Sequence, residues 1–196
     1  MGFIENRVTF RWCTPEVVER ILAWQDARGI SREETERCFK DILTYGREIL
    51  DSDEFAACFL QTHHYVSTVG DHTLHVTLHA LSHAYELQSW GHKINLRDVV
   101  TACLCHDIGI LGRHGKFAND LVCCYLHPIH SALAAKRIVP KISRKALKAI
   151  SRHMFPAFPI PPVSWVGYLL IKADKYCAYY EMKKDFAVGA TIPAAA

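Results

Sequence analysis

The chain lacks the sequence features of a β protein or of a protein with several linked domains. In its 196 residues, no stretch alternates apolar and polar positions between hairpin turns, and no internal repeat or low-complexity linker is found. Hydrophobic residues make up 50% of the chain and charged residues 22%, which is typical of a globular domain. Apolar positions recur at helical spacing instead. We therefore predict an all-α fold.

Signals for export, membrane insertion and nucleic-acid binding are also missing. The start, MGFIENRVTF, lacks the apolar core of a signal peptide, which favours a cytoplasmic protein. The eight cysteines are then expected to be reduced thiols, and without a Cys-x-x-Cys pair they do not indicate a zinc ribbon. Four prolines interrupt the uncharged stretch at 154–171, so we predict a buried loop leading into a helix and not a membrane span. The net charge of +3 is too small to indicate nucleic acid.

Capping and stop residues predict where the helices lie. Thr14 before Pro15 starts the first helix, Ser31 with Glu34 starts the second, and Asp71 is expected to cap the fourth. The expected helices cover about 15–28, 32–50, 52–61, 72–89, 96–107, 128–138, 142–153 and 164–186. Residues 1–50 form a predicted N-terminal helical extension, 51–186 the main helical bundle, and 187–196 a flexible tail. The main core stripe of the helix at 72–89 is expected to be Leu74, Leu78, Leu81 and Tyr85.

An acid inside an apolar run is the first candidate for chemistry. In TACLCHDIGILG (101–112), Asp107 directly follows His106, and the nearest basic residues are Arg97 and Arg113. A carboxylate removed from water is destabilising unless a partner compensates its charge. Nitrogen and carboxylate donors together suit divalent ions such as Zn, Mn or Fe. We predict a bound cation as this partner, against the alternative of a hydrogen-bonded Asp at a helix end.

A second acid and a row of histidines favour the same interpretation. Asp174 lies on a predicted core face, with Leu170, Ile171, Cys177 and Ala178 one turn away. The chain has 12 histidines, and four share one helix face: His72, His75, His79 and His83. We expect His79 and His83 to face solvent, whereas His72 opens its helix and can point into a cleft. A shared metal explains two buried acids better than two separate buried ion pairs do.

The order His72, His106-Asp107, Asp174 resembles the metal signature of the HD-domain superfamily of phosphohydrolases. Four segments are similar to one bacterial branch of this superfamily: HYVSTVGDH (64–72), LHPIHSALAAKRI (126–138), ISRHMFP (150–156) and IKADKYCAYYE (171–181). The resemblance covers about residues 60–182. It implies that residues 51–186 form an HD-domain helical bundle.

The resemblance also implies a set of metal ligands. A first divalent ion (Mn, Fe, Zn, Co, Ni or Mg) would be held by His72, His106, Asp107 and Asp174. A second ion, as in dinuclear members, would use His127 and His153, with Asp107 bridging the two ions and His130 as the alternative to His127.

Two departures from the family pattern leave the subclass open. Ile110 stands where many HD phosphodiesterases have a lysine, and no glutamate follows shortly after the HD pair, where deoxynucleotidases of the superfamily keep one.

Basic residues are candidates for binding a substrate phosphate. Residues 135–153 include seven basic residues and no acid, and Arg144, Lys148 and Arg152 recur at every fourth position. Such a face either attracts anionic substrates or is simply solvated. Lys116 and Lys175 are the rival phosphate partners. For the proton that the leaving oxygen needs, we name His64 and His130 as candidate general acids.

These residues predict a metal-dependent phosphohydrolase or phosphodiesterase that acts on a small phosphate ester, with a nucleotide as the expected substrate class. A di-iron oxygenase with the HD fold would use the same six ligands, and a non-catalytic metal- or ligand-binding module would keep the pocket without the reaction. No membrane and no specific nucleic-acid partner is indicated, and a homo-oligomer stays open.

Overall fold

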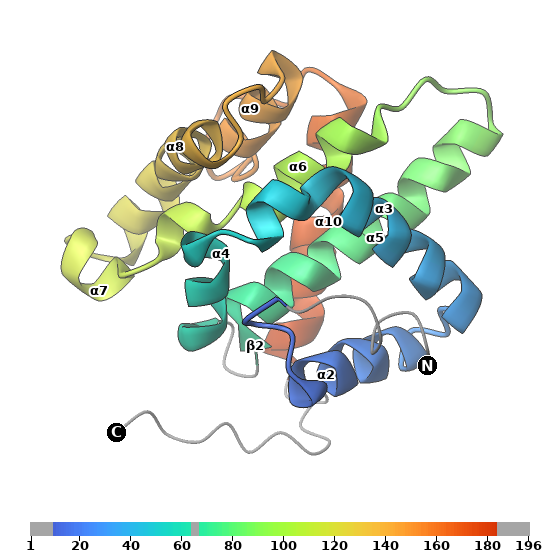
Figure 1. Ribbon diagram of the computed structural model, residues 1–196. Coiled ribbons are helices and arrows are strands. Elements are labelled where there is room, and N and C mark those ends of the chain that lie inside the picture. The colour runs from blue at the N-terminus through green and yellow to red at the C-terminus, as the bar shows by residue number, and fades with distance from the viewer. Residues whose placement is uncertain (1–9, 64–66, 184–196) are drawn as a thin grey trace.

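Helices make up nearly all of the regular structure. The computed structural model describes residues 10–63 and 67–183 (Figure 1). The helices are α2 (Pro15–Asp26), α3 (Arg32–Leu50), α4 (Asp53–Ala57), η1 (Cys58–Leu60), α5 (Val69–Ser89), α6 (Leu96–Cys105), η2 (Ile108–Ile110), α7 (Arg113–Lys116), α8 (Asp120–Ile138), α9 (Arg144–Ser151) and α10 (Trp165–Met182). Two short strands, β1 (Thr62–His63) and β2 (Ser67–Thr68), pair antiparallel. The predicted all-α fold is confirmed, with this small strand pair as an addition.

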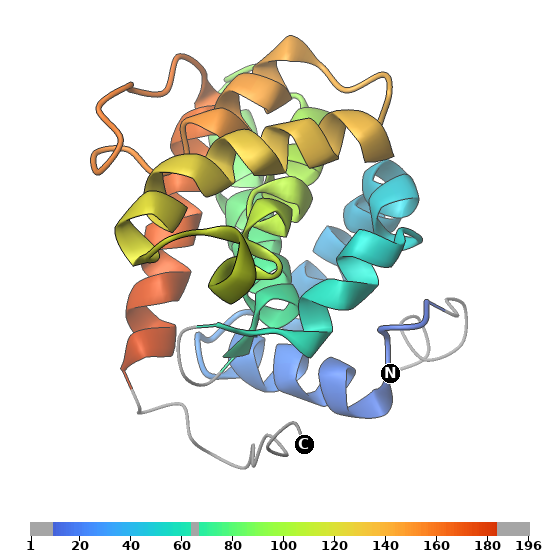
Figure 2. The ribbon, with the colours of Figure 1, turned by 90° about the vertical axis from the view of Figure 1, so that its left-hand side faces the viewer.

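Helices α5 and α6 lie at the centre of the bundle. α5 packs on α6, α10, α3 and α2, and α6 packs also on α9 and α8 (Figures 1 and 2). The predicted stripe of Leu74, Leu78, Leu81 and Tyr85 is buried, as expected. α6 is buried from Asp98 to its end, and its last turn therefore delivers the following residues into the interior.

The N-terminal helices pack against this centre. Arg20 of α2 forms an ion pair with the buried Asp71 of α5, at 3.0 Å. The Trp12 indole N–H donates to the carbonyl oxygen of Leu50, at 2.9 Å. The predicted division of the chain at residue 50 stays a prediction, and the predicted tail at 187–196 lies outside the described residues.

The start of α5 differs from the prediction. Its N-cap is Thr68 and not Asp71, so the helix begins three residues earlier. The Thr68 hydroxyl accepts from the Asp71 N–H at 3.1 Å, and the Asp71 carboxylate accepts from the Thr68 N–H at 3.2 Å. This capping box satisfies two backbone donors at once, which a lone Asp71 cap could not do. His72 therefore stands in the first turn of α5.

Two further expectations about the elements were wrong. α8 begins at Asp120, not at 128, because Asn119 caps it and the helix tolerates Pro128 in its interior. The loop at 154–164 is mostly exposed, not buried, and Ile160 and Val163 reach solvent.

Two histidines of α5 also lie differently from the prediction. His79 and His83 are half-buried, whereas full exposure was expected. The His79 ring stacks on the Tyr176 ring, with centroids 4.0 Å apart.

No helix among residues 10–63 and 67–183 has the length and apolar character needed to cross a bilayer.

Candidate metal centre

Seven buried side chains from six parts of the chain meet near the middle of the bundle. His63 comes from β1, His72 from α5, His106 and Asp107 from the end of α6, His127 from α8, His153 from the turn after α9, and Asp174 from α10. Their donor atoms form three overlapping groups: His63, His72 and Asp107; His72, His106 and Asp174; and Asp107, His127 and His153. The structure thus brings together all six residues predicted as ligands, and it adds His63.

The first half of the centre joins α5, α6 and α10. His72 Nε2 lies 3.2 Å from Asp174 Oδ1, and His106 Nε2 lies 3.9 Å from the same oxygen. The His106 Nδ1–H donates to the carbonyl oxygen of Cys103 at 2.8 Å, so its Nε2 carries a lone pair. This buried Nε2 makes no hydrogen bond among the described residues. A buried acceptor without a donor is costly, and a cation between these donors would satisfy it.

The second half joins α8 to the turn after α9. The Nδ1–H of His127 donates to the carbonyl oxygen of Cys123 at 2.8 Å, and that of His153 donates to the carbonyl oxygen of Ile150 at 2.7 Å. The Nε2 atoms of His127 and His153 then face each other at 2.9 Å. Two lone pairs at this distance repel unless a proton or a cation lies between them. The backbone contacts therefore orient both rings as ligands.

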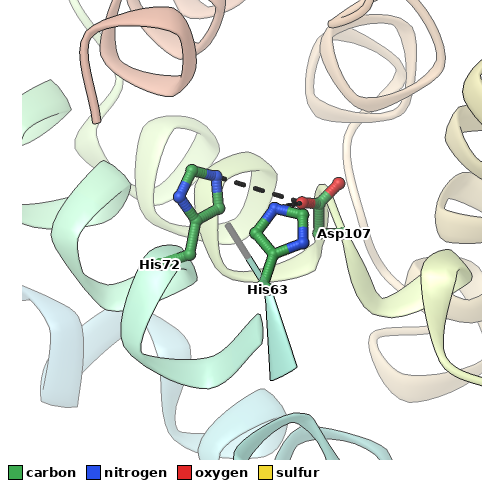
Figure 3. Close-up of side chains that lie close together, drawn as sticks. All are labelled: His63, His72 and Asp107. Atoms are coloured by element: carbon green, nitrogen blue, oxygen red, sulfur yellow. Dashed lines mark ion pairs between the residues drawn. The ribbon is translucent and has the colours of Figure 1, made fainter. Parts of the chain in front are cut away.

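Asp107 stands between the two halves. Its Oδ2 lies 3.4 Å from His106 Nε2, 3.5 Å from His63 Nε2 and 4.0 Å from His72 Nε2. Its Oδ1 lies 3.3 Å from His127 Nε2 and 3.4 Å from His153 Nε2. Figure 3 shows His63 and His72 converging on this carboxylate. Each oxygen thus serves a different histidine group, which is the placement that a bridging carboxylate requires.

The ionisation of these groups favours a cationic occupant. Burial acts to raise the pKa of Asp107, but the imidazoles of His106, His127 and His153 outweigh it and hold the pKa well below its usual range. Burial acts to raise the pKa of Asp174 as well, and His72 and Lys175 reverse the effect. Burial lowers the pKa of His106 to about 4, which keeps this ring neutral. Burial acts to lower the pKa of His72 and of His127, but the carboxylates raise it, so a bound divalent ion would displace a proton from each of these rings. Two ionised carboxylates with imidazoles then form a donor set that suits divalent transition metals.

Glu181 orients the ligand His72 through a hydrogen bond with its Nδ1. Its Oε2 accepts from His72 Nδ1–H at 3.0 Å and from the Ser67 hydroxyl at 2.7 Å, and its Oε1 accepts from His75 Nδ1–H at 2.9 Å. A carboxylate on Nδ1 holds a proton on that nitrogen, so the Nε2 of His72 would be the atom that binds a cation next to Asp174. No role was predicted for Glu181. Its position two turns after Asp174 on the same helix face was the available signal.

The comparison with family models now decides the family. The HD domain model matches residues 69–179, which is more than half of the chain. All six predicted metal ligands, from His72 to Asp174, lie within this range. The chain belongs to the HD domain family. Comparisons with curated proteins and with solved structures gave no match.

A cavity of about 210 Å³ opens onto the centre of this HD domain. Asp107, Asp174 and three of the histidines line it, together with the cationic side chains Lys175 and Arg113. Lys175 Nζ donates to Asp174 Oδ2 at 2.8 Å, so its charge lies beside the donor set. Arg113, which sequence reasoning did not propose as a phosphate partner, follows the HD turn at the start of α7.

The other predicted phosphate partners lie elsewhere. Arg144 and Lys148 are exposed on α9, because Ala146, Ala149 and Ile150 form the face that this helix buries. The Arg152 guanidinium donates to the carbonyl oxygen of Pro161 at 3.1 Å. Neither these three side chains nor Lys116 are among the described residues that line the cavity. Lys116 Nζ donates to the Gly109 carbonyl oxygen at 2.7 Å, next to the HD turn.

Of the two predicted general acids, only His130 is among the described residues, and it does not line the cavity. His130 packs edge-on against Phe117, with ring centroids 5.5 Å apart. Between His127 and His130, it is His127 that faces Asp107. His64 lies outside the described residues, whereas the neighbouring His63 lines the cavity.

Proposed function

We propose that this HD domain hydrolyses a phosphate ester or phosphodiester, with a nucleotide as the substrate class. The observation that carries the proposal is the Asp107 carboxylate, whose two oxygens face separate histidine groups at the base of a cavity lined by Lys175 and Arg113. Divalent ions held there, when bound, supply a water that is acidic near neutral pH and neutralise charge on the phosphate oxygens. The alternatives of a di-iron oxygenase or a non-catalytic module have no observation that favours them.

The side chains of the cavity suggest how the substrate is held. Lys175 and Arg113 provide the positive charge that an incoming phosphate needs. His63 lies 3.5 Å from Asp107, within reach of a group bound there, and its imidazole is a candidate donor of the proton to the leaving oxygen. The cavity is smaller than the roughly 300–1,000 Å³ of typical ligand pockets. It therefore takes the phosphate-bearing end of a substrate, while the rest of a nucleotide lies outside.

The proposal is tested with the purified protein loaded with Mn or Co and given a panel of nucleoside mono-, di- and cyclic phosphates. We expect at least one member to be hydrolysed, with release of phosphate or nucleoside, or of a nucleoside monophosphate from a cyclic phosphate, and we expect loss of this activity in Asp107→Ala. Lys175→Ala should lower kcat/KM by about 10- to 100-fold, because a charge-assisted hydrogen bond contributes about 1.5–3 kcal/mol. Lys148→Ala is the matched control, since this exposed lysine lies away from the cavity.

Two results would contradict the proposal. One is activity in Asp107→Ala equal to that of the unmodified protein. The other is an absence of hydrolysis across the panel together with oxygen consumption by the iron-loaded protein, which would assign the centre to oxygenase chemistry.

A further inference from the structure

Helix α8 has an apolar face that remains exposed in the part of the chain that the structure describes, although Tyr125 packs edge-on against Phe158. Four residues at every fourth position reach solvent: Leu121 is 66% exposed, Tyr125 40%, Ile129 45% and Leu133 56%. Leu126 on the same side is 39% exposed. α8 lies on the side of the molecule that faces the viewer in Figure 2, with its long axis across the view. Below, these five residues are called the α8 stripe.

The sequence of α8 is unusual for a surface helix. Between Asp120 and Lys136 it contains no aspartate, glutamate, lysine or arginine. Its inner face is already occupied, because Cys123, His127, Ser131, Ala134 and Ala135 are buried in the bundle. A helix that is apolar all round is normally covered on all sides, and contiguous apolar patches mark interaction sites.

The charges at the two ends of α8 indicate which partner fits. Asp120 starts the helix and Lys136 ends it, and both are exposed, whereas the adjacent Arg137 lies 3.9 Å from Glu54 of the same chain. If a second α8 lies antiparallel across the first, the acidic start of each helix meets the basic end of the other, and Leu121 lies against the partner copy's Leu133. The same surface is then used on both copies, as a two-fold interface requires.

We propose that the α8 stripe is the interface of a homodimer in which two copies of this chain pair antiparallel through α8. Because His127 stands on the inner face of the same helix, the dimer would also brace one wall of the metal centre.

Sedimentation equilibrium and light scattering of the purified protein test the proposal. The unmodified chain should have about twice the 22.3 kDa mass of one copy. Ile129→Asp and, separately, Leu133→Asp should raise the dimer dissociation constant by at least about 10-fold, because a carboxylate in the middle of an apolar contact is desolvated without a partner. Lys136→Glu should weaken the dimer as well, by placing like charges at its ends.

Leu60→Asp is the matched control, because Leu60 is the most exposed leucine at 86% and lies on η1, outside the α8 stripe. It should leave the dimer intact, and circular dichroism should show unchanged helix content in all four variants. A monomeric unmodified protein would overturn the proposal, as would a dimer that survives both stripe substitutions. Binding of the monomer to anionic vesicles through the stripe would also overturn it, since the face would then serve a membrane surface.

Discussion

Replacing Glu181 by glutamine is predicted to weaken metal binding while leaving the fold in place. The glutamate accepts three hydrogen bonds, from His72, His75 and Ser67, and its burial among them makes it one of the least exposed acids described. Glutamine has the same shape, but one of its two terminal positions is an NH2 donor. One of the two imidazoles must then accept a hydrogen bond at Nδ1 where it now donates.

Either orientation of the new amide disturbs one of the two imidazoles. If the amide NH2 faces His72, that ring moves its proton to Nε2 and loses the lone pair that points toward Asp174. If it faces His75 instead, the displaced proton appears on His75 Nε2, a buried atom with no hydrogen-bond partner among the described residues. Loss of such a supporting carboxylate usually lowers metal affinity by about 10- to 100-fold. This corresponds to about 1.4–2.7 kcal/mol of binding free energy.

Calorimetric titration of metal-stripped protein with Mn or Co measures this loss. Glu86→Gln provides the matched control, because Glu86 pairs with His83 at 3.2 Å on the surface and far along α5 from the centre. It should bind metal like the unmodified protein. A Glu181→Gln affinity within about twofold of the unmodified protein would refute the view that the His72 tautomer depends on Glu181.

The remaining predictions concern stability. A methyl group on Gly109 would collide with the backbone of α8 at His127 and Ser131, so Gly109→Ala should lower the free energy of unfolding by about 1–3 kcal/mol. Gly115→Ala should not, because a Cβ there meets no atom within 4 Å, and urea titrations of both variants check this. In metal-stripped protein, the Asp107 carboxylate raises the pKa of His127 to about 10 against the opposing effect of burial. A pKa raised on folding stabilises below the unfolded value of about 6.5, and this stabilisation is lost as the pH rises toward 10. The melting temperature of stripped protein should therefore fall between pH 6.5 and 9, and His127→Asn should reduce the fall; an unchanged slope in that variant would be inconsistent with the His127–Asp107 contact.

The sequence carried most of the fold because helix caps are local. Thr14 and Ser31 each accept from the backbone N–H three residues later, as the neighbouring Pro15 and Glu34 predicted. The predicted start of α8 at Pro128 was wrong, because the cost of a proline inside a helix can be offset by packing. Here the buried inner face of the helix offsets the lost hydrogen bond.

The ligands of the metal centre could be predicted where a charged or polar residue stands in an apolar run. His106-Asp107 and Asp174 are polar groups in apolar runs, and the conflict is visible without a structure. The role of His63 could not be predicted. The strand β1 has only two residues, which is too short for an alternating pattern to show whether His63 or the adjacent His64 points inward. The prediction that Lys148 binds phosphate was also beyond what the sequence can decide. Periodicity groups residues on one helix face, but only the packing of Ala146, Ala149 and Ile150 decides where that face points.

Metal content together with anomalous diffraction tests the central claim most directly. In crystals of the Mn-loaded protein we expect two anomalous peaks per chain, about 3.5–4 Å apart. One should lie among His72, His106 and Asp174, the other between His127 and His153, with Asp107 contacting both. Mn-saturated protein whose anomalous peaks all lie away from Asp107 would contradict the account.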